Sequence, residues 1–221
     1  MPYQTAIFDL DGTLLDTLEY LYLATNAALK HHALPCRTRD EVRMFVGNGV
    51  EMLIRRAVPA GTNEAMIQAV LAHFKSTYAA ICEDHTQPYE GILPLLTALR
   101  EKSIRVAVVS NKFDAATKQL CEKYFGNLGE VAIGERAGVR KKPAPDTVDE
   151  ALKELGVTAE GAVYIGDSDV DIETAKNCDM PCISVTWGLR DRDFLLQNGA
   201  ETLVDTPERL LGVILVYPID G

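Results

Sequence analysis

The stretch AIFDLDGTLLD, residues 6–16, raises the question on which the interpretation of the whole chain depends. Its short apolar run predicts a strand over residues 4–8. The run ends in Asp9 and Asp11, two carboxylates spaced one residue apart, and a Gly-Thr pair follows them. Like charges repel each other and are costly to remove from water, so the end of a buried strand is an unfavourable place for them. The rest of the sequence has to supply what compensates for that cost.

From about residue 92 onward, helical and strand-like segments alternate along the chain. Continuous runs of β-branched residues between helices are typical of a parallel sheet that is covered on both faces. We therefore predict an α/β fold with a Rossmann-like core, in which a parallel sheet is flanked by helices. The predicted strands cover 104–110, 131–134, 162–167 and 182–188, and the predicted helices cover 92–102, 114–124, 144–155 and 170–178.

The segment between the first strand and this alternating region has helical spacing throughout. Residues 17–33 carry apolar side chains at helical intervals, and further helical segments are predicted near 38–46, 48–58 and 63–82. An all-helical stretch thus interrupts the α/β pattern after its first strand. We predict a catalytic core made of residues 1–15 and 85–221, with residues 16–84 inserted as a helical cap.

The composition and charge disfavour several classes of partner. The chain has 221 residues, 47% of them hydrophobic, and a formal net charge of -10, which disfavours broad contact with nucleic acid or an anionic membrane. It begins without a signal-peptide pattern and has no apolar run of about 18 residues. We expect a cytoplasmic monomer or homodimer that binds a small molecule, no nucleic acid and no membrane. Its cysteines are expected to be reduced thiols, and the pair at 178 and 182 is not expected to bind zinc: Cys36, Cys82, Cys121, Cys178 and Cys182.

Polar side chains gather where the predicted strands end. In open α/β sheets, ligands bind at the carboxyl ends of the strands, so these side chains are expected to meet at one rim. The residues are Asp9, Asp11, Gly12 and Thr13 after the first strand, Ser110, Asn111 and Lys112 after the second, Lys142 before the helix at 144–155, and Asp167, Ser168, Asp169 and Asp171 after the strand at 162–167.

A divalent cation would make buried carboxylates tolerable at the strand end, because it removes most of the cost of crowding them together. Asp9, Asp167 and Asp171, with the backbone carbonyl near Asp11 and water, form an all-oxygen set of ligands. Mg²⁺ prefers octahedral oxygen ligands and keeps several waters. Zinc would normally recruit histidine or cysteine, and neither is placed to help here. The sequence therefore predicts Mg²⁺ as the cofactor.

Each of these pieces also has a simpler interpretation. An Asp-Gly pair commonly forms a tight turn, and Ser110 could cap a helix. Lys142 could be a solvated lysine, and GDSDVD (166–171) could be a capped helix start with favourable acidic residues. All four pieces, however, fall at the same end of one predicted sheet. Their joint order and placement favour a functional site over four separate structural features.

That order resembles the haloacid dehalogenase superfamily, specifically its phosphatase branch, over essentially the whole chain. DLDGT (9–13), VVSN (108–111), Lys142 before a proline, and GDSDVD are similar to the four motifs of the family in turn. The helical insertion after the first motif is where the family places a cap. The dehalogenases proper lack an aspartate at the position of Asp11, so the resemblance is to the phosphatases and phosphotransferases.

The resemblance implies catalytic roles for four residues. Asp9 would be the nucleophile that forms an aspartyl-phosphate. Asp11 would act as general acid toward the leaving group and then as general base for water. Ser110 would hydrogen-bond a phosphoryl oxygen, and Lys142 would neutralise charge between the phosphate and the nucleophile.

The remaining motif residues are implied to bind the metal and the substrate. Asp167 would hold Mg²⁺ together with Asp9 and the Asp11 carbonyl, and Asp171 would complete or orient that set of ligands. Thr13 and Asn111 are assigned to substrate binding.

The cap is expected to select the substrate. FVGNGVEMLIRRA (45–57) and the C-terminal region resemble phosphoglycolate phosphatases, which makes phosphoglycolate the leading candidate. Asn48 and Arg55 are assigned to substrate binding, with Arg56 as an alternative partner for a substrate carboxylate. Both arginines also fit the solvated face of an amphipathic helix. No catalytic role is assigned to the following residues: His31, His32, His73, His85 and Trp187.

Two other functions remain open at this point. A phosphosugar mutase on the same fold would retain phosphate in a sugar bisphosphate instead of releasing it. A non-catalytic binding protein would have no reason to keep both Asp9 and Asp11 together with Lys142 and Asp167.

Overall fold

The computed structural model describes residues 3–81 and 86–216. The chain divides into two compact units, one formed by residues 1–15 and 88–221 and the other by residues 16–87. The predicted domain boundary between residues 84 and 85, as well as Cys82 and His85, lies outside the described residues. Each unit is described by itself.

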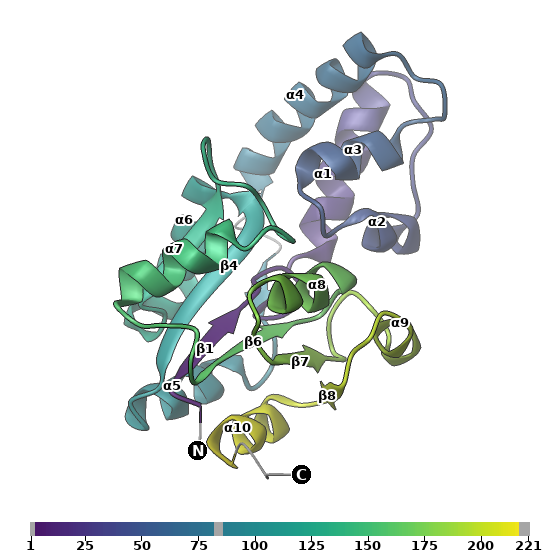
Figure 1. The fold of residues 1–221 in the computed structure, drawn as a ribbon. Helices are drawn as coiled ribbons and strands as arrows, with labels where there is room; N and C mark the ends of the chain where they lie inside the picture. Colours follow the sequence, from purple (N-terminus) through teal and green to yellow (C-terminus); the bar gives the residue numbers. More distant parts are fainter. Residues whose placement is uncertain (1–2, 82–85, 217–221) are drawn as a thin grey trace. The chain divides into compact units, whose positions relative to one another are not determined.

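The α/β unit is built around a six-stranded sheet. Helices alternate with the strands of this sheet along the chain, from α5 after β1 to α10 after β8 (Figure 1). The bounds are β1 Thr5–Phe8, α5 Ile92–Glu101, β4 Arg105–Phe113, α6 Asp114–Phe125, a short 3-10 helix at Gly126–Leu128, β5 Val131–Glu135, α7 Asp146–Leu155, β6 Ala162–Gly166, α8 Asp169–Asn177, β7 Cys182–Val185, α9 Arg192–Gln197, β8 Thr202–Val204 and α10 Pro207–Val216.

The strand order β5-β4-β1-β6-β7-β8 is parallel throughout and confirms the predicted α/β core. The chain adds β4 and β5 on one side of β1 and the later strands on the other, so the order reverses at β1. Phe8 pairs with Val108 on β4 and with Ile165 on β6. The residues just beyond these three therefore meet at one edge, which is the place where ligands bind in sheets of this kind.

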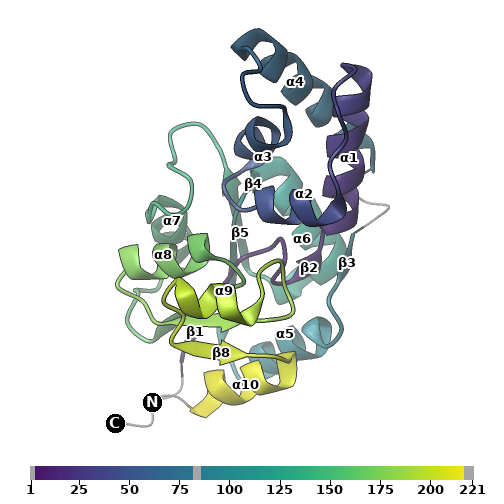
Figure 2. The same ribbon diagram turned by 90° about the vertical axis from the view of Figure 1, so that its right-hand side faces the viewer.

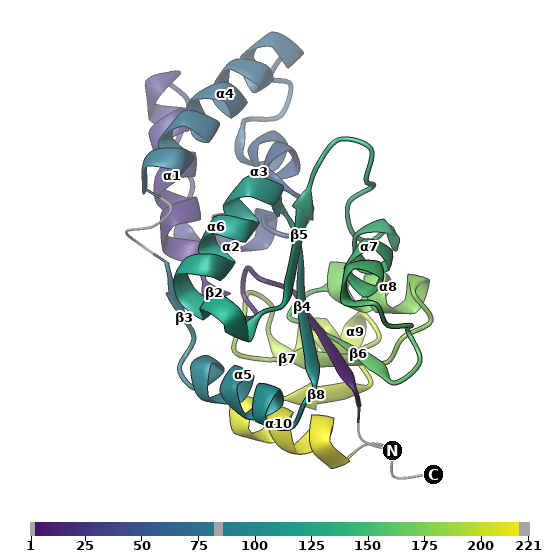
Figure 3. The ribbon, with the colours of Figure 1, turned by 90° about the vertical axis from the view of Figure 1, so that its left-hand side faces the viewer.

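The two faces of the sheet bury different helices, because successive side chains of a strand point to opposite faces. Ala6 and Phe8 pack with apolar residues of α5, α6 and α10. Ile7 lies on the other face, with residues of α7 and α8. Figure 3 shows α5 and α6 on one side of β4 and α7 and α8 on the other. This double covering explains why the strands are almost uniformly apolar.

Some of the predicted elements differ from the observed ones. β4 runs to Phe113 with an irregular register after Val109, so Ser110, Asn111 and Lys112 lie in the strand and not after it. The strand predicted over 182–188 ends at Val185. β8 and the helices α9 and α10 were not predicted. β8 is only three residues long, which is too short for a period of two to stand out.

Over its described residues, 16–81 and 86–87, the second unit contains the helices α1 to α4, in segments where helices were predicted (Figure 2). α1 packs against α4, and the Tyr20 and Tyr78 rings meet edge to face with centroids 5.3 Å apart. That this unit acts as a cap stays a prediction. A two-stranded ribbon, β2 with β3, lies where the chain passes between the units. The bounds are β2 Leu15–Asp16, α1 Leu18–His31, α2 Arg39–Phe45, α3 Val50–Ala57, α4 Glu64–Ile81 and β3 Gln87–Pro88.

Candidate active site

Lys142 lies at the centre of the cluster at the carboxyl edge of the sheet. Its side chain is only 3% exposed. Its ammonium Nζ lies 2.7 Å from Asp9 Oδ1 and 2.8 Å from Asp171 Oδ1, and it donates to the Tyr164 hydroxyl at 3.0 Å. Burial alone lowers the pKa of Lys142, but the carboxylates of Asp171 and Asp9 outweigh burial and raise it. Lys142 is therefore held in its charged form between two aspartates.

The backbone of Lys142 is fixed by a side chain from β4. The Asn111 side chain donates to the Lys142 carbonyl at 2.9 Å and accepts from its amide at 2.8 Å. The Lys142–Pro143 peptide bond is cis, and the Pro143 carbonyl accepts from Asn177 at 2.9 Å. Asn111 thus positions Lys142. The expectation that it also contacts substrate stays a prediction.

Three buried aspartates meet beside Lys142. Asp9, Asp167 and Asp171 each offer a carboxylate oxygen, and these atoms lie within 4.8 Å of one another. Burial raises the pKa of Asp9; Lys142 opposes that rise, and Asp171 and Asp167 add to it. Burial also raises the pKa of Asp167 to about 7, and the nearby Asp171 charge adds to the effect. The carboxylates are thus costly to keep ionised by themselves, which is the situation that a cation relieves.

Asp167 is held in place by hydrogen bonds from two other segments of the chain. Its Oδ1 accepts from the Thr13 hydroxyl at 3.0 Å, and its Oδ2 accepts from the Leu189 amide at 2.6 Å. Thr13 is fully buried, and its hydroxyl is used to hold Asp167. A substrate contact for Thr13 remains a prediction. The loop carrying Leu189 is anchored in turn, because the Trp187 indole donates to the Thr13 carbonyl at 3.0 Å.

Two glycines leave room for the Asp167 carboxylate. A Cβ at Gly12 would lie 2.8 Å from Asp167 Cγ, and one at Gly188 would collide with the Gly12 carbonyl and with Asp167. Gly12 also has a φ of +92°, a backbone conformation that side chains other than glycine rarely adopt. The close approach of these two loops to Asp167 therefore requires glycine at both positions.

Gly12→Ala should disturb Asp167 directly. We expect the free energy of unfolding to fall by about 1–3 kcal/mol from backbone strain and activity to fall with it, since the added methyl group displaces the carboxylate. Gly212→Ala is the matched control, because Gly212 lies on α10 with no atom near its Cβ position. That variant should be at least as stable as the native protein. Urea unfolding and phosphate release measure both effects, and equal behaviour of the two variants would contradict this explanation.

Asp171 has both of its oxygens engaged by protein donors. Oδ2 accepts from the Ser168 hydroxyl at 2.6 Å and from the amides of Ser168 and Asp167 at 3.1 and 3.2 Å. Oδ1 accepts from Lys142 and from the Tyr164 hydroxyl, the latter at 3.1 Å. Ser168 and Asp171 also form a capping box at the start of α8. Asp171 therefore ties the helix start to Lys142.

Asp11 is paired with a lysine that the sequence analysis left without a role. Lys112 Nζ lies 2.9 Å from Asp11 Oδ1, and the Lys112 side chain is 2% exposed. Ser110, two residues earlier, is also buried, and its hydroxyl accepts from the Lys112 amide at 3.2 Å. The carboxyl end of β4 thus contributes Ser110, Asn111 and Lys112 to the same edge as β1. The position of Lys112 directly after Ser110 and Asn111 was the available signal.

Tyr164 is the second residue that sequence reasoning missed. It lies inside an apolar strand, so the pattern predicts a core side chain. Its ring is fully buried on the face covered by α7 and α8. Its hydroxyl bridges Lys142 and Asp171, and no feature of the sequence distinguishes it from an ordinary core tyrosine.

Tyr164→Phe removes only that hydroxyl. We expect the free energy of unfolding to fall by about 1–3 kcal/mol, because hydrogen bonds to charged groups are lost, and we expect kcat to fall more than KM rises. Tyr20→Phe is the control, since it removes another buried tyrosine hydroxyl, from the helical unit. An unchanged kcat in Tyr164→Phe would show that the hydroxyl does not position Lys142 for the reaction.

The substrate residues predicted in the helical unit are engaged with other groups there. Arg55 donates to Glu51 and Glu64 at 2.7–3.0 Å, and these hydrogen bonds raise its pKa. Arg56 donates to the Phe45 carbonyl at 2.9 Å and to Asn48 Oδ1 at 2.7 Å. The structure thus pairs Arg56 with Asn48 and pairs Arg55 with carboxylates. Substrate binding by Asn48 or Arg55 stays a prediction.

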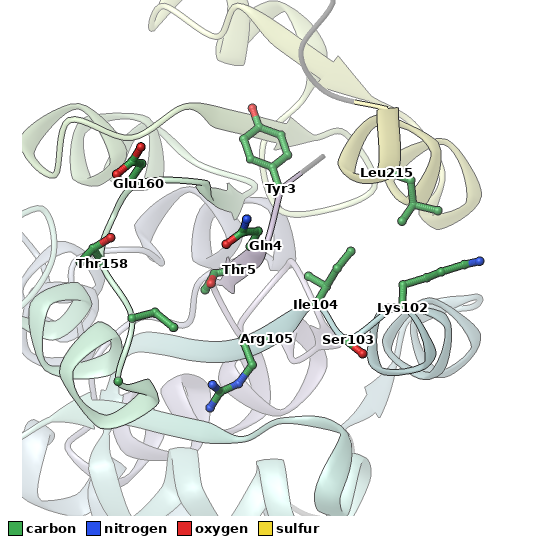
Figure 4. Close-up of a pocket in the computed structure, with 12 residues that line it drawn as sticks. Tyr3, Gln4, Thr5, Lys102, Ser103, Ile104, Arg105, Thr158, Glu160 and Leu215 are labelled. Atoms are coloured by element: carbon green, nitrogen blue, oxygen red, sulfur yellow. The ribbon is translucent and has the colours of Figure 1, made fainter. Parts of the chain in front are cut away.

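A hollow of about 660 Å³ lies at the opposite, amino edge of the sheet, where β1 and β4 begin. Figure 4 shows its lining, which includes Tyr3, Lys102 and Arg105. Arg105 is paired with Glu130 at 2.6 Å, and the lining has no group of neighbouring carboxylates like the one around Lys142. Within residues 3–81 and 86–216, no helix combines the length and the apolar character needed to cross a membrane.

Comparisons with known proteins agree with the site. Residues 6–185 match the haloacid dehalogenase-like hydrolase family. The phosphoglycolate phosphatase of Pseudomonas putida is 32% identical over 213 residues, covering 93% of this chain and 77% of the relative. That of Colwellia psychrerythraea is 31% identical over 215 residues, covering 94% of this chain and 95% of the relative.

A solved structure from Lactobacillus delbrueckii subsp. bulgaricus, proposed to be a phosphoglycolate phosphatase, superposes with a TM-score of 0.92. It is 38% identical to this chain and covers 97% of it and 99% of its own length. The family match extends from β1 to β7 and includes every strand that contributes to the Lys142 cluster. The chain therefore belongs to the haloacid dehalogenase-like hydrolase family and is a phosphatase.

Proposed function

We propose that this phosphatase hydrolyses a small phosphomonoester with Mg²⁺ through an aspartyl-phosphate on Asp9, and that phosphoglycolate is its leading substrate. The observation that carries the proposal is the buried ammonium of Lys142, which lies 2.7 Å from Asp9 Oδ1 within the cluster of Asp9, Asp167 and Asp171. This arrangement provides a nucleophile, a fixed positive charge and oxygen ligands for a cation at one sheet edge.

The donor set fits Mg²⁺. The three side chains of the cluster are carboxylates, and no histidine or cysteine of the described residues belongs to it; this is the ligand chemistry that Mg²⁺ prefers and zinc does not. Because both Asp171 oxygens already accept from protein donors, we assign Asp9 and Asp167 as side-chain ligands, with the Asp11 carbonyl, and assign Asp171 to orientation. When bound, the ion neutralises negative charge on the carboxylates and on the phosphoryl group.

Asp9 is the nucleophile in this proposal. Lys142 holds its Oδ1, and Oδ2 attacks phosphorus as the ester P–O bond breaks, which leaves an aspartyl-phosphate and an alkoxide. Asp11 donates a proton to the alkoxide. Water then attacks phosphorus and gives a proton to Asp11, the bond between phosphorus and Oδ2 breaks, and Asp9 and inorganic phosphate are regenerated.

The other residues position the reacting groups. Lys142 and the Ser110 hydroxyl face the charge that develops on the phosphoryl oxygens, and Lys112 holds Asp11 through its carboxylate. Since the transition state of phosphoryl transfer is loose and its charge is spread over oxygens, positioning and electrostatic stabilisation supply most of the rate enhancement.

Phosphoglycolate is proposed because relatives that are more than 30% identical are phosphoglycolate phosphatases. A panel of small phosphorylated metabolites, measured as free phosphate, tests this choice. We expect the highest kcat/KM for phosphoglycolate. A clear preference for another phosphomonoester would reject the substrate and leave the phosphatase assignment in place. Phosphate retained in a sugar bisphosphate would instead identify a mutase.

A further inference from the structure

Three histidines come together in the helical unit. Two of them are adjacent at the end of one helix, and the third lies on another helix. His31 is the last residue of α1, His32 follows it as the cap residue, and His73 lies on α4. One ligating atom of each lies within 4.8 Å of the other two. The ring centroids of His31 and His73 are 4.0 Å apart, and those of His31 and His32 are 4.9 Å apart. The packing of α1 on α4 produces this cluster.

The cluster contains a polar atom that the fold leaves without a partner. His32 Nε2 is buried and has no hydrogen-bond partner among the described residues. A buried imidazole nitrogen without a partner costs free energy, and structures that keep one usually satisfy it with water or an ion. The proposed phosphatase reaction uses none of the three histidines, so this cost has no explanation in the catalytic site.

The surroundings of His73 favour its neutral form. Burial lowers the pKa of His73, and the neighbouring His31 and His32 lower it further. A neutral imidazole is the form that binds metal ions, and it is also the form that avoids repulsion among three adjacent rings. A divalent ion would hold the rings together without that repulsion.

The type of donor selects the type of ion. Three imidazole nitrogens suit Zn²⁺, Cu²⁺ or Ni²⁺ and are poor ligands for Mg²⁺ and Ca²⁺. Nitrogens bound to one tetrahedral Zn²⁺ at about 2.0–2.1 Å are roughly 3.3 Å apart, so the rings must close up slightly. His31 is exposed and lies at the end of its helix, and its ring has the freedom to turn out of the stack with His73.

We propose that His31, His32 and His73 form a binding site for one zinc-type divalent ion, with water completing its coordination. The site is separate in chemistry from the all-carboxylate cluster around Lys142. It would tie the end of α1 to the middle of α4 and so stabilise the helical unit, and it does not depend on the proposed phosphatase mechanism.

Calorimetric titration of the full-length, metal-stripped protein with Zn²⁺ tests the site. Millimolar Mg²⁺ is present throughout so that it competes for the carboxylates. We expect one Zn²⁺ per chain and a rise in Tm on binding. His73→Gln and His31→Ala should each weaken Zn²⁺ binding by at least about tenfold and remove the rise in Tm. The exposed position of His31 makes the second variant informative even if His73→Gln folds poorly.

Two variants serve as matched controls. His85→Gln removes the fourth histidine of the chain, and Cys36→Ser removes an exposed thiol; both should bind Zn²⁺ as the native protein does. X-ray absorption at the zinc edge should show three imidazoles. Binding that persists unchanged in His31→Ala and His73→Gln, or that is lost only with Cys36, would overturn the proposal, as would the absence of stoichiometric Zn²⁺ binding.

Discussion

Asp9→Asn should reduce turnover by on the order of 10⁴- to 10⁶-fold, the range seen when a nucleophile is removed from a catalytic group that acts as a unit. The amide keeps the shape of the side chain but cannot attack phosphorus. The buried Asp9 carboxylate has a raised pKa, which means that its ionised form is unfavourable in the fold. We therefore expect the metal-free variant to lose no more than about 1 kcal/mol of folding free energy.

Phosphate release and urea unfolding measure these two quantities on the same preparation. Asp205→Asn is the control, because Asp205 forms an exposed ion pair with Arg209 and follows β8, which is separated from β1 by β6 and β7. It should keep full activity. If Asp9→Asn retained activity near that of the native enzyme, the nucleophile would be another residue.

Removal of divalent ions should abolish hydrolysis of a generic phosphomonoester. Without a cation, Asp9 and Asp167 face each other as buried carboxylates, and burial raises the pKa of both. An excess of EDTA should bring the rate to background, and Mg²⁺ should restore it. Ca²⁺ should not restore it, because Ca²⁺ prefers more ligands at longer distances than Mg²⁺ does.

The chelation experiment uses the same phosphate assay with the metal content checked by elemental analysis. Asp167→Asn should require more Mg²⁺ for half-maximal activity, whereas the Asp205→Asn control should not. Full activity of protein shown to be free of metal would contradict the assignment of the carboxylates as cation ligands.

The sequence predicted the core of this protein well because polar residues mark the points where apolar strands end. Asp9 and Asp167 directly follow apolar runs, and parallel strands bring their carboxyl ends to one edge. The meeting of Lys142 with Asp9, across 133 positions of the chain, follows from that topology. Short elements such as β8 carry too few residues for a periodic pattern, and so they were missed.

The contacts within the site were harder to predict, because they depend on distances that no periodicity encodes. Tyr164 has the sequence pattern of a core residue, and only its hydroxyl reaches Lys142. The Leu189 amide that holds Asp167 belongs to the backbone and has no residue signature. Asn111 was expected at the substrate, but its amide holds the Lys142 backbone.

The most direct test of the account is to identify the phosphorylated residue. Enzyme mixed with substrate and Mg²⁺ is quenched in acid during turnover and reduced with borohydride, which converts an aspartyl-phosphate to homoserine. Peptide mass spectrometry then locates the modified position. If Asp9 is the nucleophile, homoserine appears at residue 9 in the native enzyme and not in Asp9→Asn. Modification of another residue, or none while phosphate is released in a burst, would contradict it.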